Sequence, residues 1–385
     1  MNNFFTHYDW NTLIHNSSIN NTDYSVAAYH DILCQPEDYP EFLDKYIALP
    51  ALQRLAGIGL LCGSDWTKLF NNRFYYSRLD HSIGVALIIW HFTHDKAQTI
   101  SGLLHDISTS VFSHVSDFRK GDALNQTITE GPTAYMIRND QQLQELLKAD
   151  GLASCDVEDY HKYPVADNEI PQLSADRLEY MFPSGMAMCG NISMKDVSRM
   201  YADIEVLVNQ DGLPELGFKT KEIAEEYCRF FCLIGHALQL NEDKLSLQLL
   251  GVIMNQAVEL GVLTEADFMT LSEREVIGKI EKFISTATCH SAPDHKLRDR
   301  NGTTADFARL YHTFRNMTKV EHTEQALPTD KYFSISLKVK QRYINPLTVC
   351  SGGAGRLYDL SPLARQIIDD FKSFNDTAYG CVPLI

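Results

Sequence analysis

The stretch Ser-Gly-Leu-Leu-His-Asp-Ile-Ser at residues 101–108 places a histidine and an aspartate side by side, directly after an apolar turn. Burying His105 and Asp106 in such surroundings without compensation would cost several kcal/mol. A buried histidine is more often a hydrogen-bonded core residue than a ligand, so the pair alone is weak evidence. A bound divalent cation would provide the compensation, and it would require further ligands elsewhere in the chain.

Two other segments carry candidate ligands of the same kind. The sequence RLDHSIGV at residues 78–85 contains one histidine, and QLSADRLEYMF at residues 172–182 contains one aspartate. Both candidates are embedded in apolar segments that have a helical period. Two imidazoles and two carboxylates suit one borderline divalent cation. The sequence therefore predicts a metal site made of His81, His105, Asp106 and Asp176.

Length and composition narrow the classes of protein to consider. With 385 residues, 44% of them hydrophobic, the chain can bury a large core. Its net charge of -16 repels the phosphate backbone, so we expect no nucleic-acid partner. Nine cysteines without a Cys-x-x-Cys pair indicate free thiols in a reducing compartment. The longest strongly apolar run, residues 83–90, is far too short to span a membrane, so we expect a cytoplasmic protein.

Hydrophobic periodicity predicts that most of the chain is helical. Residues 80–95 and 97–106 should form two of these helices, the second one carrying the His-Asp pair. No repeat of fixed period and no low-complexity tract is present, which excludes a solenoid. The further predicted helices are 131–149, 172–182, 195–209, 219–240, 242–260, 264–270 and 272–286.

The pattern changes after Asp330. Residues 332–343 alternate between apolar and polar side chains, which predicts a strand. Its polar face is basic and could meet phosphate, although a solvated face is the commoner outcome for such a pattern. The Gly-rich segment 351–355 is expected to be a turn between two elements, since no Gly-Lys-Ser/Thr follows it.

These segments together resemble the HD-domain metal-dependent phosphohydrolases, and within them the deoxynucleoside triphosphate triphosphohydrolase branch. The resemblance rests on the order His, His-Asp, Asp and on its surroundings SRLDHSIGVA, LLHDISTSVFSHVSDF and SADRLEYM. It extends to VKQRYINPLTV near the C-terminus and covers roughly residues 45–375. A His-Asp pair recurs by chance in many chains, whereas the whole constellation is specific.

The resemblance implies a mainly α protein, with an HD-domain helical core and a small C-terminal β-containing (α+β) appendage. The corresponding regions are an N-terminal extension (1–45), the core (46–290) and the C-terminal region (291–385). It also implies one divalent transition metal (Mn, Fe, Zn, Co or Ni), possible Mg²⁺ bound with the substrate phosphates, and a homo-oligomer, either a dimer or a tetramer. The site residues that it adds are His114 and Asp117 for catalysis, and Arg78, Arg177 and Tyr180 for a small phosphorylated substrate such as a nucleotide.

The chain departs from the branch at several positions. A further histidine, three residues after the Asp of the doublet, is replaced by Thr109, which cannot shuttle a proton near neutral pH. A His-Glu pair is replaced at Thr129-Glu130, a sugar-reading glutamine by Leu60, and an Arg-Asp pair by Pro183-Ser184. Three functions stay open: hydrolysis of a nucleotide or other phosphate ester, a metal-binding regulatory module, and metal-centred oxidation. We rank hydrolysis first, the regulatory module second and oxidation last. Oxidation would need a second cation, for which residues 107–175 offer only His114 and His161.

Overall fold

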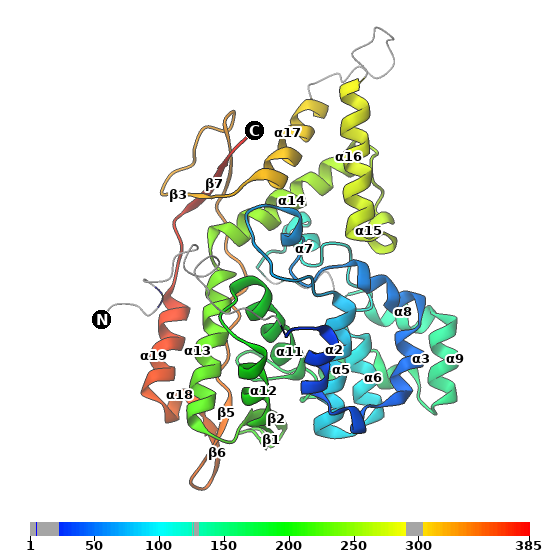
Figure 1. Ribbon diagram of the computed structural model, residues 1–385, viewed down its shortest axis with the longest axis vertical. Helices are drawn as coiled ribbons and strands as arrows, with labels where there is room; N and C mark the ends of the chain where they lie inside the picture. The colour runs from blue at the N-terminus through cyan, green and yellow to red at the C-terminus, as the bar shows by residue number, and fades with distance from the viewer. Residues whose placement is uncertain (1–4, 6–22, 125, 127–130, 290–302) are drawn as a thin grey trace.

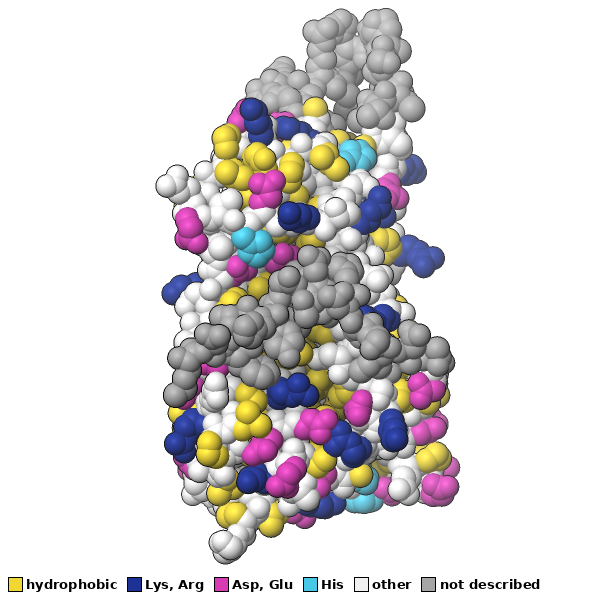
Figure 2. All heavy atoms as spheres, turned by 60° about the vertical axis from the view of Figure 1, so that its left-hand side comes forward, with side chains coloured by type: hydrophobic (Ala, Val, Ile, Leu, Met, Phe, Trp, Pro, Cys, Tyr) yellow, Lys and Arg dark blue, Asp and Glu magenta, His cyan; other side chains and the backbone are white. Residues whose placement is uncertain are grey.

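A computed structural model describes residues 5, 23–124, 126, 131–289 and 303–385 (Figure 1). Helices make up most of that part of the chain and two small sheets complete it, which confirms the mainly α prediction. Every helix in the described ranges is too short or too polar to cross a bilayer. Acidic and basic side chains are interspersed over the face seen in Figure 2, so the negative net charge is not gathered there into one patch.

Two antiparallel helices carry the decisive sequence. Helix α5 (Arg78–Thr93) begins at Ser77, whose side chain and that of Asp80 form a reciprocal capping box. Helix α6 (Lys96–Leu104) follows after a short turn and packs against α5. The predicted helix 97–106 is wrong at its end, because the chain leaves the helix after Leu104 through tight turns. The His-Asp pair therefore lies on a turn and not within a helix.

Two other helix predictions also need correction. The range 131–149 is divided at Asp140, whose side chain accepts a hydrogen bond from Leu143 N and caps a new helix. The range 195–209 contains a helix only up to Ala202, and its end is strand β1 (Ile204–Val208), in which β-branched residues alternate. The elements concerned are α8 (Thr133–Asn139), α9 (Gln141–Ala149) and α12 (Met194–Ala202).

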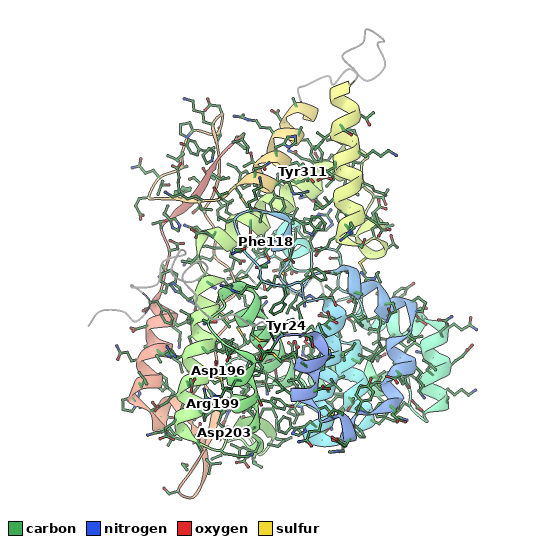
Figure 3. The ribbon with its side chains drawn as sticks, viewed as in Figure 1. Tyr24, Phe118, Asp196, Arg199, Asp203 and Tyr311 are labelled. Atoms are coloured by element: carbon green, nitrogen blue, oxygen red, sulfur yellow. The ribbon has the colours of Figure 1, made fainter. Side chains whose placement is uncertain are left out.

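Helix α14 crosses the molecule obliquely in the upper half of Figure 1. Helices α5, α6, α11 and α13 lie below it in that view, and α16 and α17 lie above it. Phe118, labelled in Figure 3, lies near this crossing, where α7 packs on α14. The bounds are α2 (Val26–Leu33), α3 (Asp44–Ile47), α4 (Pro50–Gln53), α7 (Val115–Arg119), α10 (Ser154–Val157), α11 (Ala175–Ser184), α13 (Lys221–Ala237), α14 (Asn241–Glu259), α15 (Asp267–Thr270), α16 (Glu273–Cys289), α17 (Thr303–Asn316), α18 (Leu357–Leu360) and α19 (Pro362–Ser373).

Two sheets complete the fold. The first has the order β1-β2-β5-β6, in which β2 and β5 are parallel and the outer pairs are antiparallel. The second is antiparallel with the order β3-β7-β4. In the first sheet, β1 and β2 precede residue 290 and β5 and β6 follow it, so this sheet joins the predicted core to the predicted C-terminal region. The boundaries predicted between the three regions stay predictions. The bounds are β2 (Pro214–Phe218), β3 (Glu321–Thr323), β4 (Tyr332–Ile335), β5 (Leu347–Cys350), β6 (Gly353–Arg356) and β7 (Tyr379–Pro383).

The predicted strand 332–343 is only partly correct. Strand β4 ends at Ile335, and the following residues up to the start of β5 form no ladder. This segment instead runs close to α13, where a Cβ added to Gly235 would lie 2.5 Å from the carbonyl oxygen of Arg342. Glycine is thus required there for a close backbone approach. The turn predicted at 351–355 is confirmed for Ser351 and Gly352, which join β5 to β6, whereas residues 353–355 belong to β6 itself.

A glycine substitution tests the packing of α5 on α6. A Cβ at Gly102 would clash with Ile89 Cδ1 and lie 3.3 Å from Val85 Cγ1, and both of these side chains are fully buried. We expect Gly102→Ala to lower the free energy of unfolding by roughly 1–3 kcal/mol through overpacking. Urea denaturation measures the change. Gly278→Ala in α16 is the matched control, since its Cβ meets nothing within 4 Å and alanine favours helix there. Equal effects of the two substitutions would contradict the packing argument.

Candidate metal centre

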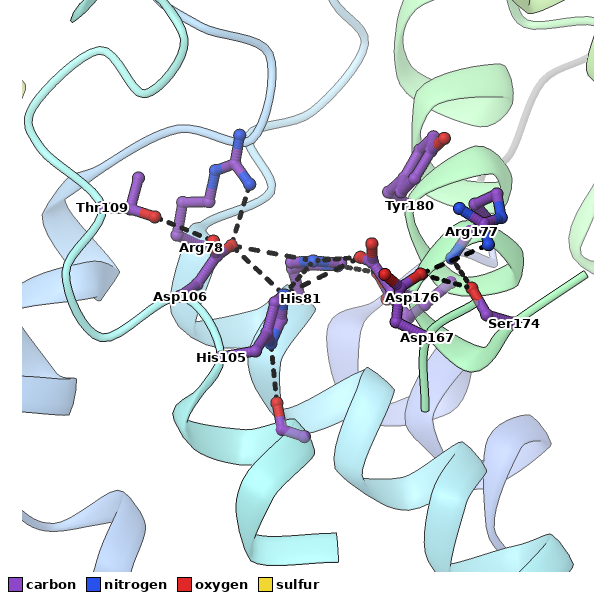
Figure 4. Close-up of polar contacts among 12 residues, drawn as sticks. Arg78, His81, His105, Asp106, Thr109, Asp167, Ser174, Asp176, Arg177 and Tyr180 are labelled. Carbon is purple, nitrogen blue, oxygen red and sulfur yellow. Dashed lines mark hydrogen bonds and ion pairs between the residues drawn. The ribbon is translucent and has the colours of Figure 1, made fainter. Parts of the chain in front are cut away.

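Three elements bring the four predicted ligands together. His81 projects from the first turns of α5, His105 and Asp106 lie on the turn after α6, and Asp176 lies in the first turn of α11 (Figure 4). Ligand atoms of His81, His105 and Asp106 all lie within 4.8 Å of one another. Asp176 Oδ1 is 3.2 Å from His81 Nε2 and 3.7 Å from His105 Nε2. Residues nearly a hundred positions apart in the sequence thus meet at one point.

The two imidazoles are oriented so that their Nε2 atoms face each other. Nδ1 of His105 lies 2.7 Å from the carbonyl oxygen of Gly102 and donates to it. Nδ1 of His81 donates to a carboxylate oxygen of Glu179. The two Nε2 atoms, which carry lone pairs when both rings are neutral, are 3.2 Å apart. Two converging lone pairs repel unless a positive charge lies between them, and fixing Nδ1 in this way is the usual support for a metal-binding histidine.

Glu179 is a site residue that the sequence analysis missed. Its side chain is fully buried, and Tyr76 donates a hydrogen bond of 2.6 Å to Oε1 while His81 binds Oε2. A Cβ at Gly84 would lie 2.5 Å from Glu179 Oε1, so only glycine leaves room for the carboxylate between α5 and α11. The sequence did contain a signal for Glu179. This residue lies three positions after Asp176, so on a helix the two side chains are neighbours on the same face.

The charges around the centre favour a cation. Burial opposes the ionisation of Asp106, but Arg78 and the two histidines outweigh it and hold the pKa of this carboxyl well below its usual range. Arg78 Nη1 donates to Asp106 Oδ2 at 2.8 Å, and Thr109 donates to Oδ1 at 2.8 Å. Burial disfavours the charged form of His81, yet nearby carboxylates raise its pKa to about 10. A positive charge is therefore favoured where the imidazoles meet, either a proton on His81 or a cation that takes its place.

The donor set fits a divalent transition metal. Two imidazole nitrogens and two carboxylates are borderline ligands that suit manganese, iron, zinc, cobalt or nickel. The histidine side chains are 1% and 5% exposed, whereas those of Asp106 and Asp176 are 15% and 19% exposed. The acidic side of the centre is therefore the more open one, and a substrate would approach it from there.

A cavity of about 160 Å³ adjoins the centre, which is room for roughly five water molecules. Besides the four candidate ligands, the predicted residues Arg78, His114 and Tyr180 line it. His114 Nδ1 lies 2.9 Å from Oδ2 of the fully buried Asp117, which orients the imidazole from behind. Burial lowers the pKa of His114 despite that carboxylate. Their roles in catalysis stay predictions.

Arg177, for which a substrate-binding role was predicted, does not line the cavity, so the geometry does not support that role. Its guanidinium donates to the carbonyl oxygens of Gln172 and Asn168 and lies 3.3 Å from Asp167 Oδ1. Figure 4 shows it turned toward Asp167, away from His81 and Asp106. Arg177 therefore holds the loop that precedes α11 and does not line the cavity.

The cavity wall includes charged residues that the sequence analysis did not assign to the site. Arg342, in the segment after β4, donates to Gln126 Oε1 at 2.5 Å, lies 3.5 Å from His114 Nε2 and faces the Tyr180 ring at 5.9 Å. Lys340 also lines the cavity. The basic face that was expected in solvent thus contributes partly to the site, because the chain leaves the sheet after Ile335. Asp243 of α14 is the third such residue.

Some of the positions at which the chain departs from the triphosphohydrolase branch lie at the cavity. Leu60 and Ser184 line the cavity, and the Thr109 hydroxyl is bound to Asp106. Thr129-Glu130 lies outside the described residues. His161 pairs with Asp167 at 2.9 Å and does not line the cavity, so it offers no support for a second cation beside the first.

No protein-family model matches the chain. Among curated proteins, it is 27% identical over 189 residues to YdhJ of Bacillus subtilis, an uncharacterized protein, with 48% of this chain and 55% of YdhJ covered. It is 26% identical over 181 residues to the metal-dependent phosphohydrolase cns2 of Cordyceps militaris, with 46% and 51% covered. The chain spans about half the length of the curated relatives it matches.

Solved structures match over nearly the whole chain. A hypothetical protein from Aquifex aeolicus has a TM-score of 0.57 at 17% identity, with 90% of this chain and 93% of that protein covered. A phosphohydrolase from Bacteroides thetaiotaomicron has a TM-score of 0.55 at 14% identity, with 89% and 95% covered. At such identities the likeness shows a shared fold.

Asp243 makes the stability of the protein depend on pH. Burial raises the pKa of its carboxyl to about 7, although Lys244 and Arg342 oppose this. Between the ordinary pKa of 3.8 and about 7, the folded protein keeps a proton that the unfolded chain has released, so this contribution to stability falls as pH rises. Asp243→Asn removes this pH-dependent contribution. We therefore expect the free energy of unfolding of the variant, measured relative to that of the wild type, to be higher at pH 8 than at pH 5. Urea denaturation at both pH values measures this, with Asp359→Asn at an exposed position of α18 as the control. A difference between Asp243→Asn and wild type that is the same at both pH values would contradict it.

Proposed function

We propose that this protein is a metal-dependent phosphohydrolase of the HD type that acts on a small phosphate ester, with a nucleotide as the preferred class of substrate. The observation that carries the proposal is the convergence of His81, His105, Asp106 and Asp176 beside a cavity that has basic side chains in its wall. The names of cns2 and of the Bacteroides structure support the same chemistry.

The four ligands would hold a divalent cation, which when bound polarises a phosphoryl group and lowers the pKa of water. Arg78 is held by Asp106 and by Ser113, whose Oγ lies 2.9 Å from Arg78 Nε, so it is preorganised beside the centre. Arg342 and Lys340 add positive charge from another part of the wall. These three side chains would bind the phosphate oxygens and stabilise the negative charge that develops on them.

His114 is placed to move a proton. Its lowered pKa favours the neutral imidazole near pH 7, and the hydrogen bond to Asp117 leaves the lone pair on Nε2. Nε2 lies on the side of Arg342, so a proton taken from water would be accepted in the basic part of the cavity. Asp117 would keep the tautomer and the ring orientation, and would stabilise the imidazolium as it forms.

The remaining wall favours a substrate with a flat or apolar portion next to its phosphate. Tyr180 offers a ring face, and Phe118, Leu60 and Leu247 add apolar surface. Ligand pockets that combine such surface with a few converging polar groups are typical of small-molecule sites. A nucleoside would fit this mixture better than inorganic phosphate alone. Base, sugar and the number of phosphates stay open within this class.

One observation favours a second function, a metal-binding module that senses a nucleotide without hydrolysing it. Thr109 occupies the place of a catalytic histidine in the resembling family, and its hydroxyl is engaged with the ligand Asp106. Substrate binding would then persist while turnover is absent. The two functions are separated by comparing bound nucleotide with released phosphate in the same preparation.

Substitution of the His-Asp pair tests the main proposal. With manganese added, purified protein should release phosphate from at least one member of a panel of nucleotides and phosphomonoesters. His105→Ala and Asp106→Ala should each reduce the rate to background, because each removes a ligand and leaves the partner charges uncompensated. His312→Ala, at an exposed position of α17, is the control and should keep full activity. A metal-loaded wild type that binds nucleotides but releases no phosphate would overturn hydrolysis in favour of the sensing module.

A second substitution tests the basic wall. Arg342→Gln should lower kcat/KM by roughly 10- to 100-fold, since one charge-assisted hydrogen bond to phosphate is lost. The metal content should not change, because Arg342 contacts no ligand. Steady-state kinetics and elemental analysis measure the two effects, and Arg365→Gln on α19 is an exposed control of the same chemistry. Kinetics equal to those of the wild type would exclude Arg342 from the substrate site.

A further inference from the structure

A second cluster of potential metal ligands lies where α14 begins. Glu242 is the second residue of α14, His322 is the central residue of β3, and Asp376 lies shortly before β7. Ligand atoms of the three residues lie within 4.8 Å of one another. A Cβ at Gly380, the β7 partner of His322, would lie 2.6 Å from Asn241 Cβ. The C-terminal sheet is therefore packed tightly against the start of α14.

Glu242 has an unsatisfied oxygen in this cluster. The residue is 4% exposed, and its Oε1 lies 2.9 Å from His322 Nε2. The other oxygen, Oε2, is fully buried and has no hydrogen-bond partner among the described residues. A buried acceptor without a donor is costly, and it is more costly when it is charged. A cation bound by the carboxylate would remove that cost.

Asp376 fixes the histidine from the opposite side. Its Oδ1 lies 2.9 Å from His322 Nδ1, and its two oxygens also accept hydrogen bonds from Thr377 N and Asn241 N. A carboxylate that holds one ring nitrogen while the other faces a second carboxylate is the arrangement that supports metal-binding histidines. With His322 neutral, the two carboxylates leave a negative charge even beside Lys244.

We propose that His322 Nε2 and the Glu242 carboxylate bind a second divalent cation, best matched by zinc, which fastens the C-terminal sheet to α14, while Asp376 holds the imidazole through Nδ1. One imidazole nitrogen and the oxygens of one carboxylate, completed by water, are ligand types that zinc accepts. A protonated His322 that bridges two carboxylates is the alternative, and it leaves Glu242 Oε2 without a partner. The site is separate from the first centre, although Asp243, the neighbour of Glu242, lines the cavity.

Zinc content tests the proposal independently of any activity. Full-length protein is stripped with a chelator, equilibrated with zinc and assayed by elemental analysis and calorimetry. Glu242→Gln keeps an acceptor for His322 and removes the charge, and it should lose one equivalent of zinc. The loss should occur both in the wild-type background and in His105→Ala/Asp106→Ala, which leaves the first centre out of the count. Asp376→Asn should weaken zinc binding by about 10- to 100-fold.

Glu259→Gln, at an exposed position of the same helix, is the matched control and should keep all bound zinc. Zinc should also raise the Tm of His105→Ala/Asp106→Ala, and Glu242→Gln should abolish that rise. Unchanged zinc content in Glu242→Gln would overturn the site and leave an ion pair of protonated His322. If Glu242→Gln fails to fold, the test is the visible absorption of cobalt added in place of zinc. A visible band in His105→Ala/Asp106→Ala supports the site, and no band overturns it.

Discussion

The opposition of two imidazole nitrogens 3.2 Å apart is the constraint on which the centre depends. Each ring is fixed through Nδ1, by a backbone carbonyl in one case and by Glu179 in the other. Neither ring can turn away without breaking that hydrogen bond inside the core. Packing thus holds the two Nε2 atoms together, and with both rings neutral a bound cation relieves the repulsion between their lone pairs.

Two glycines allow the helices that carry the centre to approach each other closely. Gly84 admits the Glu179 carboxylate between α5 and α11, and Gly102 admits α5 against the end of α6. Both glycines lie in helices, where they cost conformational entropy. The cost is offset because close helix approach places His81 over the turn that carries His105 and Asp106. The geometry of the metal site therefore depends on the packing of α5 against α6 and α11, and a substitution that disturbs this packing should also displace the ligands.

The sequence predicted the parts of the site that depend on residue type. The mainly α fold and the four converging ligands followed from apolar periodicity and from the chemistry of histidine and aspartate, and the structure brings these side chains together. Parts that depend on tertiary packing were beyond it. Arg342 lies on an alternating segment that was expected in solvent, but this segment runs close to Gly235 and Arg342 lines the cavity. Arg177 has the residue type of a phosphate ligand, yet local carbonyls bind it.

The replacement of a family histidine by Thr109 bears on how protons can move in this site. The hydroxyl donates to Asp106 and so strengthens a ligand instead of supplying a titratable group. His114 and Asp117 then form the remaining imidazole-carboxylate pair in the described cavity wall and its support. Burial lowers the pKa of His114, and the positive charge of Arg342 beside Nε2 also disfavours the imidazolium. In the proposed reaction, a phosphate bound at Arg342 would partly neutralise that charge and so raise the basicity of His114.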